Sequence, residues 1–319
     1  MKCKALTMTK ISNSFQRFRI VGICCLIFSA AAQAQLSGEL RTISKFHSLE
    51  IEDRRIDIWK PANVSEGPYQ LLIMHDGQML FQADSTWNGQ EWGVDECLDS
   101  LYDQSLIGPT LVVGIWNIPE RRHQNYFPQK AFESLPEAFK DSVLQLERPG
   151  EERKLLYGSP NSDAYLRFIF KELLPWVKSE YPIQNNGVYM MGSSMGGLIS
   201  MYAALEYPYE LKGVACMSTH WPGFFQNENN PVPDAFINYI ASHEEAAAKS
   251  RWYFDRGDAS LDALYPPHQD RVDSLFHSWP IVSVRDYKSL VAPGDPHWET
   301  AWRSRLPMAL IYLMGRSRE

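Results

Sequence analysis

Apolar and polar positions follow two different patterns along the chain, and segments with these two patterns alternate. Short, mainly apolar runs are typical of parallel strands buried on both faces, and the segments between them carry apolar residues at helical spacing. This alternation predicts an α/β fold with a mostly parallel central sheet and helices on both faces. The expected buried strands are 69–74, 110–115, 188–191, 213–218, 252–255 and 280–284, and the expected helices are 94–101, 162–177, 198–205, 263–278 and 299–314.

Two other segments have different patterns. Residues 48–51 and 55–59 alternate between apolar and polar side chains around the charged residues 52–54, which is typical of a β-hairpin. Residues 121–160 lack a clear period and contain several prolines and many charges, so we expect an excursion over the sheet there.

The stretch VYMMGSSMGGL at 188–198 carries the most specific pattern. A strand-like run leads into Gly192-Ser193-Ser194-Met195-Gly196, and a helix-like run follows directly. This is G-x-S-x-G in a strand–turn–helix setting, which places a serine hydroxyl at the tip of a sharp turn. Both positions two residues from the serine are glycine, where we expect a side chain to clash. We therefore predict Ser194 as a nucleophile; the alternative is a Gly/Ser-rich turn without chemistry.

A serine nucleophile needs a general base, and in this kind of fold the order along the chain is Ser, Asp or Glu, then His. Three histidines follow the strand 252–255, after which the acid is expected. His268 and His277 lie within the predicted helix 263–278, which favours packing or surface roles. His297 lies in a loop between the last strand and the last helix, over the carboxyl edge of the sheet. We predict His297 as the base.

The acid that orients the base is expected in the loop after the strand 252–255. That loop offers Asp255, Asp258 and Asp262. Asp255 still belongs to the strand and is therefore interpreted as structural. Asp262 reaches furthest over the sheet edge, so it is the predicted acid, with Asp258 as the alternative.

An oxyanion hole needs two backbone N–H donors. One is expected from Met195, the residue after the nucleophile, and the other from the loop after an early strand. That loop is His75-Asp76-Gly77-Gln78, and we predict the Gln78 N–H as the second donor, with Gly77 or Met79 as alternatives. His75 lies near the predicted site, but its place in the chain order does not suit the base.

Several motifs stand in a fixed order and span most of the chain from about residue 45. They are MHDGQMLF at 74–81, TWNGQEWGVDE at 86–96, VVGIWNIPERR at 112–122, GSSMGG at 192–197, YFDRGDASLDALY at 253–265 and HWETAWRSRLP at 297–307. Together they resemble the esterase D-like family of α/β-hydrolases, which includes siderophore, feruloyl and acetylxylan esterases, S-formylglutathione hydrolases and mycolyltransferases. The resemblance implies an α/β-hydrolase fold, the roles predicted above for Ser194, Asp262 and His297, and an ester substrate without a metal or organic cofactor; the variable acid loop keeps Asp258 open.

The N-terminal residues have the pattern of an export signal. A basic region precedes the apolar run 20–32, which is too short to be a good membrane span, and Ala32-Gln33-Ala34 fits a cleavage site. We therefore predict a signal peptide at 1–34, a single domain at 35–319 and a periplasmic or secreted protein without stable membrane insertion. A retained anchor or a lipoprotein is the alternative. Cleavage removes five basic residues, so the formal charge of −7 would fall by five to −12, which disfavours nucleic-acid partners.

Several side chains have two open interpretations. Cys97 and Cys216 remain after cleavage and form either one disulfide or two free thiols. Arg121 and Arg122 meet an anionic substrate or, as the sequence favours, solvent. The tryptophans in loops beyond the strand ends either stack on a sugar or aromatic acyl group or hold these loops in place. They are Trp87, Trp92, Trp116, Trp221 and Trp298.

The favoured function is an exported serine ester hydrolase that works through an acyl-enzyme on a carbohydrate-linked acyl group, a siderophore or a small ester. An acyltransferase with the same three residues is one alternative, because an alcohol then replaces water. A non-catalytic binding protein on a hydrolase fold is another. The sequence makes no prediction of the oligomeric state.

Overall fold

The computed structural model describes residues 37–316, apart from residues 63, 65, 66, 149, 151, 226–228 and 284. The predicted signal peptide at 1–34, its cleavage site and Gln35 lie outside the described residues. In the described part of the chain, eight strands form one sheet in the order β1-β2-β4-β3-β5-β6-β7-β8. The strands are β1 (Glu39–Phe46), β2 (Arg54–Lys60), β3 (Tyr69–His75), β4 (Thr110–Ile115), β5 (Ile183–Ser193), β6 (Gly213–Met217), β7 (Arg251–Arg256) and β8 (Tyr287–Val291).

The sheet is mostly parallel, as predicted. β2 pairs antiparallel with β1 and with β4, and every other pair of neighbours in the sheet is parallel. In β3, Leu71 and Ile73 point into one hydrophobic core, whereas Leu72 and Met74 point into the other. Successive side chains of a strand alternate between faces, so a strand buried on both faces reads as a continuous apolar run.

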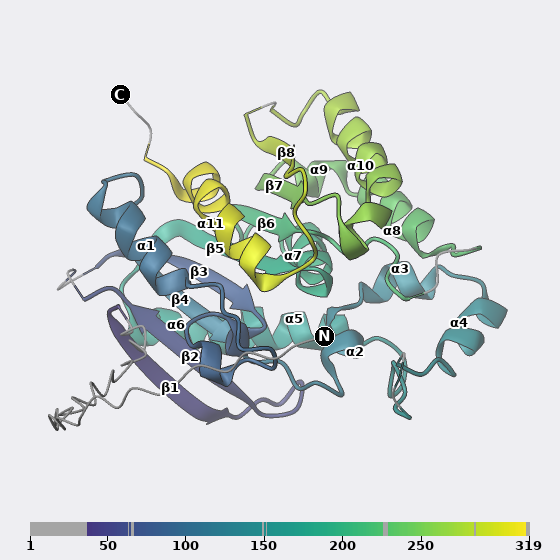
Figure 1. The fold of residues 1–319 in the computed structure, drawn as a ribbon, viewed down its shortest axis with the longest axis horizontal. Coiled ribbons are helices and arrows are strands. Elements are labelled where there is room, and N and C mark those ends of the chain that lie inside the picture. Colours follow the sequence, from purple (N-terminus) through teal and green to yellow (C-terminus); the bar gives the residue numbers. More distant parts are fainter. Residues whose placement is uncertain are drawn as a thin grey trace, which may run out of the picture. The chain divides into compact units, whose positions relative to one another are not determined.

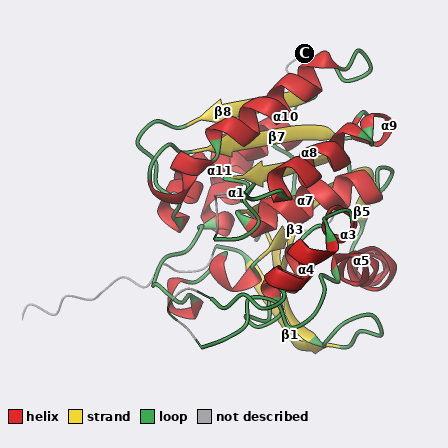
Figure 2. Ribbon diagram, turned by 90° about the vertical axis from the view of Figure 1, so that its right-hand side faces the viewer, coloured by secondary structure: helices red, strands yellow, loops and turns green. Residues whose placement is uncertain are grey.

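Helices cover both faces of this sheet (Figure 1). α1 (Val94–Asp103) and α11 (Glu299–Met314) supply the smaller core, and α5 (Ser162–Arg167), α7 (Met195–Glu206) and α8 (Val232–Ala241) belong to the larger one. Figure 2 shows the sheet between these two groups of helices. The remaining helical segments are α2 (Arg122–Tyr126), α3 (Gln129–Glu133), α4 (Glu137–Val143), the π-helix η3 (Phe168–Leu173), α6 (Leu174–Glu180), α9 (Glu244–Ala247), α10 (Pro266–Ser278) and the 3₁₀ turns η1 (Gly77–Met79), η2 (Ala83–Ser85) and η4 (Ser260–Leu264).

Two predicted strands are wrong, and both lie at an edge of the sheet. Residues 48–51 form a loop that Glu172 holds through Ser48 and Leu49, and the hairpin partner of β2 is β1. Residues 280–283 form a turn after Trp279, and β8 pairs with β7 in their place. β1 and β8 carry many exposed or half-buried residues, so their sequences lack the continuous apolar pattern of the central strands.

The excursion at 121–160 contains α2, α3 and α4 and packs onto the larger core. The Phe127 ring stacks on Phe224 at a centroid distance of 4.8 Å and also contacts Phe236 of α8.

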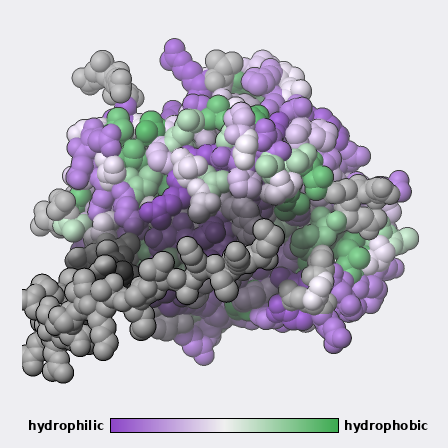
Figure 3. Space-filling view, in the orientation of Figure 1, coloured by the Kyte–Doolittle hydropathy of each residue, from purple (hydrophilic) through white to green (hydrophobic). Residues whose placement is uncertain are grey.

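Figure 3 shows hydrophilic residues over much of one face of the molecule, with hydrophobic residues in smaller groups.

Candidate active site

The turn around Ser194 has the predicted strand–turn–helix form. It joins β5 to α7, and Ser194 has a φ of 57° and a ψ of −120°, which is strained for a residue with a side chain. The Ser194 N–H donates to the Met217 carbonyl at the end of β6 over 2.9 Å, and the Ser194 carbonyl accepts the His220 N–H over 3.2 Å. The neighbouring strand and the loop after it therefore hold the strained turn.

The two glycines that flank the turn differ in what they require. A Cβ at Gly192 would lie 2.6 Å from the Gly196 carbonyl carbon, so the predicted clash is confirmed there. A Cβ at Gly196 would lie 3.5 Å from the His75 Cβ, which is an ordinary contact, so the predicted clash at Gly196 is wrong. A Cβ at the next residue, Gly197, would lie 3.0 Å from the Thr219 hydroxyl oxygen, which is tighter.

His297 and Asp262 lie in direct contact. His297 lies between β8 and α11, and its Nδ1 is 2.5 Å from Oδ1 of Asp262, a fully buried residue of η4. Burial alone would raise the pKa of the Asp262 carboxyl. Hydrogen bonds to Asp262, first of all from His297, outweigh burial and hold that pKa below its usual value. The ionised carboxylate can only accept, so the proton of the shared bond resides on His297 Nδ1.

The other two carboxylates of the acid loop have different partners. The exposed Asp258 accepts the Gly294 N–H over 2.6 Å and so holds the loop that leads to His297. Asp255 lies buried at the end of β7, 3.5 Å from the Arg305 guanidinium, and burial raises its pKa to about 6. Among these three aspartates, Asp262 is the one that contacts His297.

A buried tyrosine, Tyr265, packs against His297. Its hydroxyl lies 2.9 Å from His220 Nδ1, and burial raises its pKa well above the usual value, an effect that the nearby Ser194 side chain opposes. The Tyr265 ring meets the His297 ring edge-on at a centroid distance of 5.8 Å. Within the described residues, no hydrogen bond joins the side chains of Ser194 and His297.

Tyr265 and His220 were not predicted as site residues. His220 comes two residues after the end of the expected strand 213–218, at the carboxyl edge of the sheet, and this place in the sequence could have indicated a site residue. Tyr265 carries no such signal, because tyrosines are common in protein cores.

The two predicted oxyanion donors lie in segments that approach each other. η1, which contains Gln78, follows β3, and the Cβ position of Gly196 in α7 is 3.6 Å from Oδ2 of the adjacent Asp76. Met195 opens α7, and the first N–H groups of a helix have no acceptor within it. A Cβ at Gly77 would lie 2.7 Å from the Gly114 carbonyl carbon, so the η1 loop can approach β4 only with glycine there.

Arg122 anchors this loop. Its Nε and Nη2 donate to the two carboxylate oxygens of Asp76 over 2.8 and 2.7 Å, and Asn117 adds a third hydrogen bond to Asp76. Burial would raise the pKa of Asp76, but the Arg122 charge outweighs burial and lowers it. The favoured prediction of a solvated Arg122 is therefore wrong. Arg121 is half-exposed and pairs with Glu52 over 2.8 Å.

The five tryptophans divide into two groups. Three hold loops in place: the ring nitrogens of Trp221 and Trp116 donate to Gln269 and Asp57, and Trp92 is buried against Trp302. The other two, Trp87 and Trp298, have exposed fractions of 74% and 45% and lie together, with ring centroids 6.4 Å apart.

Cys97 and Cys216 are free thiols, so the disulfide interpretation is wrong. Burial raises the pKa of both thiols.

Within the described ranges, no group of three or more His, Cys, Asp and Glu side chains has the arrangement of a metal site. The same ranges contain no helix with the length and apolar character needed to cross a bilayer.

A family model described as "Putative esterase" matches residues 49–313. The chain belongs to this family. Family membership makes it a hydrolase that acts on esters, and the resemblance seen in the sequence is confirmed. A curated relative, the uncharacterized protein YbbA of Bacillus subtilis (strain 168), is 27% identical over 176 residues, which cover 53% of this chain. That match spans 58% of the length of YbbA.

Several solved structures share the fold. The BES protein from Bacillus cereus superposes with a TM-score of 0.65 at 15% identity, over 88% of this chain and 98% of that chain. A ferulic acid esterase superposes with a TM-score of 0.60 at 14% identity, over 88% and 99%. The ferric enterobactin esterase from Salmonella typhimurium superposes with a TM-score of 0.57 at 17% identity, over 88% of this chain and 59% of that chain. The esterase family match and these neighbours show that the chain has an α/β-hydrolase fold.

Proposed function

We propose that this esterase is a serine hydrolase of carboxylic esters, with Ser194 as nucleophile, His297 as general base and Asp262 as the acid that orients the base. The contact between His297 Nδ1 and Asp262 Oδ1 carries this proposal, because it leaves Nε2 as the ring nitrogen that can accept a proton. The strained turn of Ser194, where β5 meets α7, supports the assignment of the nucleophile.

The proposed reaction has two halves. His297 takes the Ser194 proton while the Ser194 oxygen attacks the ester carbonyl, and the oxyanion binds to the N–H groups of Met195 and Gln78. The carbonyl reforms, the alcohol leaves with the proton from His297, and the acyl group stays on Ser194. A water molecule then attacks the acyl-enzyme while His297 takes its proton; the bond between the acyl group and Ser194 breaks, the Ser194 oxygen receives the proton back from His297, and the acid is released. Throughout, Asp262 stays ionised and stabilises the charged imidazole.

A fluorophosphonate probe tests the nucleophile directly, because it bonds to an activated serine and not to an ordinary one. We expect the adduct on Ser194 in the purified chain and no adduct in Ser194→Ala. Ser193→Ala is the matched control, since it removes the neighbouring hydroxyl of the same turn and should keep the adduct. An adduct on Ser193, or none in the wild-type protein, would refute the assignment.

We further propose that the alcohol part of the ester is a carbohydrate. His297 protonates the leaving alcohol, so this part of the substrate lies on the His297 side of the site. Trp298 follows His297 in the chain and pairs with the exposed Trp87, and two exposed indole faces suit stacking on a sugar ring. Beside them, Asn88 donates to Glu299 over 2.7 Å, which adds polar groups to the same edge.

The tryptophan pair is tested with two substrates that share an acyl group. We expect Trp298→Ala and Trp87→Ala to lower kcat/KM for acetylated xylan about tenfold or more and to leave turnover of p-nitrophenyl acetate near wild type. Tyr209→Ala is the control, because it removes an exposed aromatic side chain that lies outside the loops of the site. An equal loss on both substrates would contradict a carbohydrate subsite.

Export through the residues at 1–34 is also part of the proposal. It is supported by the basic and apolar pattern of the sequence alone. N-terminal sequencing of the protein isolated from its producing cell, with cell fractionation, tests it. Export predicts a chain that begins at Gln35 outside the cytoplasm, and a cytoplasmic chain that retains residues 1–34 would refute it.

A further inference from the structure

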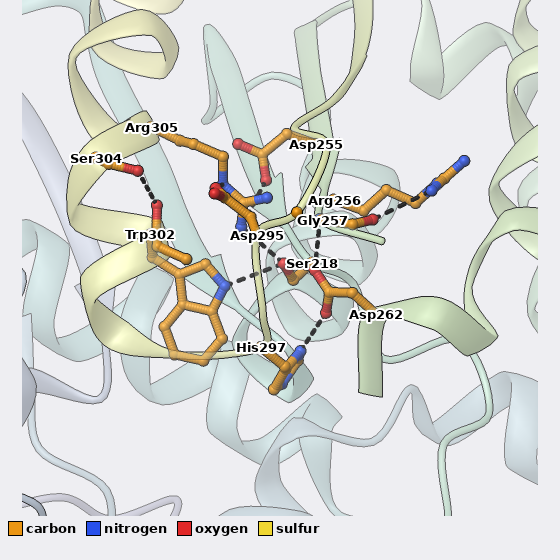
Figure 4. A network of polar contacts seen from close by, with 12 residues as sticks. Ser218, Asp255, Arg256, Gly257, Asp262, Asp295, His297, Trp302, Ser304 and Arg305 are labelled. Carbon is orange, nitrogen blue, oxygen red and sulfur yellow. Dashed lines mark hydrogen bonds and ion pairs between the residues drawn. The ribbon is translucent and has the colours of Figure 1, made fainter. Parts of the chain in front are cut away.

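Ser218 lies at the centre of a buried polar network behind Asp262 (Figure 4). It directly follows β6, is fully buried, and its N–H donates to the Asp255 carbonyl at the end of β7 over 2.8 Å. Its φ of 43° is in the left-handed region, which serine rarely adopts. A strained backbone persists only where the surrounding contacts hold it, so the contacts of this side chain are informative.

The hydrogen bonds of the Ser218 hydroxyl have only one possible direction. The Trp302 indole nitrogen lies 3.0 Å from Ser218 Oγ, and Nη2 of Arg305 lies 2.9 Å from it. An indole N–H and a guanidinium can donate but cannot accept, so these two donors occupy both lone pairs of the serine oxygen. The single hydroxyl proton is left for the third partner, Oδ2 of Asp262, at 2.6 Å.

This arrangement fixes the orientation of the Asp262 carboxylate. Oδ2 accepts the Ser218 hydroxyl and also the Gly257 N–H, each over 2.6 Å. Oδ1 is thereby directed at His297 Nδ1. Since the two carboxylate oxygens have different partners on opposite sides, rotation of the carboxylate would break several hydrogen bonds at once.

Arg305 is itself held away from Asp262. Its guanidinium lies between Asp255 and Asp295, at 3.5 and 3.7 Å, and its side chain has an exposed fraction of 9%. The positive charge is therefore shared with two other carboxylates. Arg305 reaches the acid of the site through the Ser218 hydroxyl, as Figure 4 shows.

We propose that Ser218 is a positioning residue. Trp302 and Arg305 donate to its oxygen, so its hydroxyl proton is donated to Asp262, and this hydrogen bond orients the carboxylate toward His297. The inference rests on the proposed function, because it gives Ser218 a part in orienting the proposed base. Ser218 acts through Asp262 and takes no part in bond making or breaking.

Two variants that lack the hydroxyl test the role of the Ser218–Asp262 hydrogen bond. Ser218→Ala removes the oxygen but keeps the strained φ, whereas Ser218→Gly also relieves the strain and so favours folding. Ser304→Ala is the control, because among the described residues the Ser304 hydroxyl bonds only to the Ala301 carbonyl of its own helix. Each variant is first checked for a cooperative thermal transition.

The first readout is the downfield proton resonance of His297 Nδ1–H, which needs no substrate. We expect a sharp resonance in the wild-type protein and in Ser304→Ala, and an upfield shift or broadening in both Ser218 variants. The second readout is turnover of p-nitrophenyl acetate, where kcat should fall up to about a hundredfold with little change in KM, because misorientation affects the chemical step.

A folded Ser218→Gly protein with a wild-type resonance and wild-type kcat would overturn the proposal. If the wild-type protein neither turns over the ester nor reacts with a fluorophosphonate, the proposed function fails. The resonance then still decides whether Ser218 orients the Asp262–His297 pair.

Discussion

The Nδ1 atom of His297 lies 2.5 Å from Oδ1 of Asp262, whereas Asp258 of the same loop accepts the N–H of Gly294. We therefore expect Asp262→Asn to lower kcat for p-nitrophenyl acetate by about 10⁴-fold, because an amide cannot stabilise the required imidazole tautomer. Asp258→Asn is the matched control and should lower kcat less than about tenfold, since it loosens only the loop. A larger loss for Asp258→Asn than for Asp262→Asn would assign the acid to Asp258.

The two glycines of the serine turn should respond differently to the same change. Gly192→Ala places a Cβ 2.6 Å from backbone, so we expect it to lower the free energy of unfolding by about 1–3 kcal/mol. Gly196 is helical and has room, so Gly196→Ala should be neutral or stabilise by up to about 1 kcal/mol. Urea unfolding measures both, and equal destabilisation would show that the turn tolerates no side chain at either position.

The Arg122–Asp76 ion pair at the η1 loop should contribute more to the free energy of unfolding than the Arg121–Glu52 pair nearer the surface. Arg122→Met leaves the largely buried Asp76 without its main cation, so we expect a loss of about 3 kcal/mol in the free energy of unfolding. Arg121→Met removes a half-exposed pair with Glu52 and should cost less than about 1 kcal/mol. Urea unfolding of the two variants side by side checks the difference, and similar losses would contradict a structural role for the Asp76–Arg122 pair.

The buried His75 should make stability depend on pH. Burial lowers its pKa from 6.5 to about 3, so between these values the unfolded chain binds a proton that the folded chain does not. The free energy of unfolding should therefore fall as the pH drops below about 6.5, by about 1.4 kcal/mol per pH unit from this histidine. His123, whose pKa is likewise lowered to about 3, adds a slope of the same sign.

Two variants isolate the His75 contribution. His75→Phe should flatten the pH slope, measured by urea unfolding at pH 7, 6, 5 and 4. Tyr165→Phe removes the hydroxyl that bonds to His75 Nδ1 but keeps the histidine, so the slope should persist. An unchanged slope in His75→Phe would show that other groups govern the pH dependence.

The central strands could be predicted from the sequence, and the edge strands could not. Residues of β3 and β4 are buried on both faces and read as uninterrupted apolar runs. β1 and β8 have a neighbour on one side only and carry exposed residues, so the alternating segment 48–51 and the apolar segment 280–284 fit a strand pattern better than they do. The hydrophobic pattern reports burial, and an edge strand has little of it.

The site divides in a similar way. Ser194, Asp262 and His297 could be proposed because each occupies a fixed place relative to a predicted strand. Ser218 bonds to Asp262, and His220 bonds to Tyr265, through hydrogen bonds between segments that only the fold brings together. The pairing of Arg122 with Asp76 was missed for the same reason, because an arginine in a polar stretch looks solvated until its partner is located.

The most direct test of the serine mechanism is turnover of p-nitrophenyl acetate by the wild-type chain, Ser194→Ala and Ser193→Ala. An acyl-enzyme that breaks down more slowly than it forms predicts an initial burst of p-nitrophenol equal to the amount of enzyme, followed by steady turnover, in the wild-type protein and in Ser193→Ala. Ser194→Ala should show neither phase. Wild-type turnover that persists in Ser194→Ala would contradict the serine mechanism, and so would the absence of turnover in the wild-type protein.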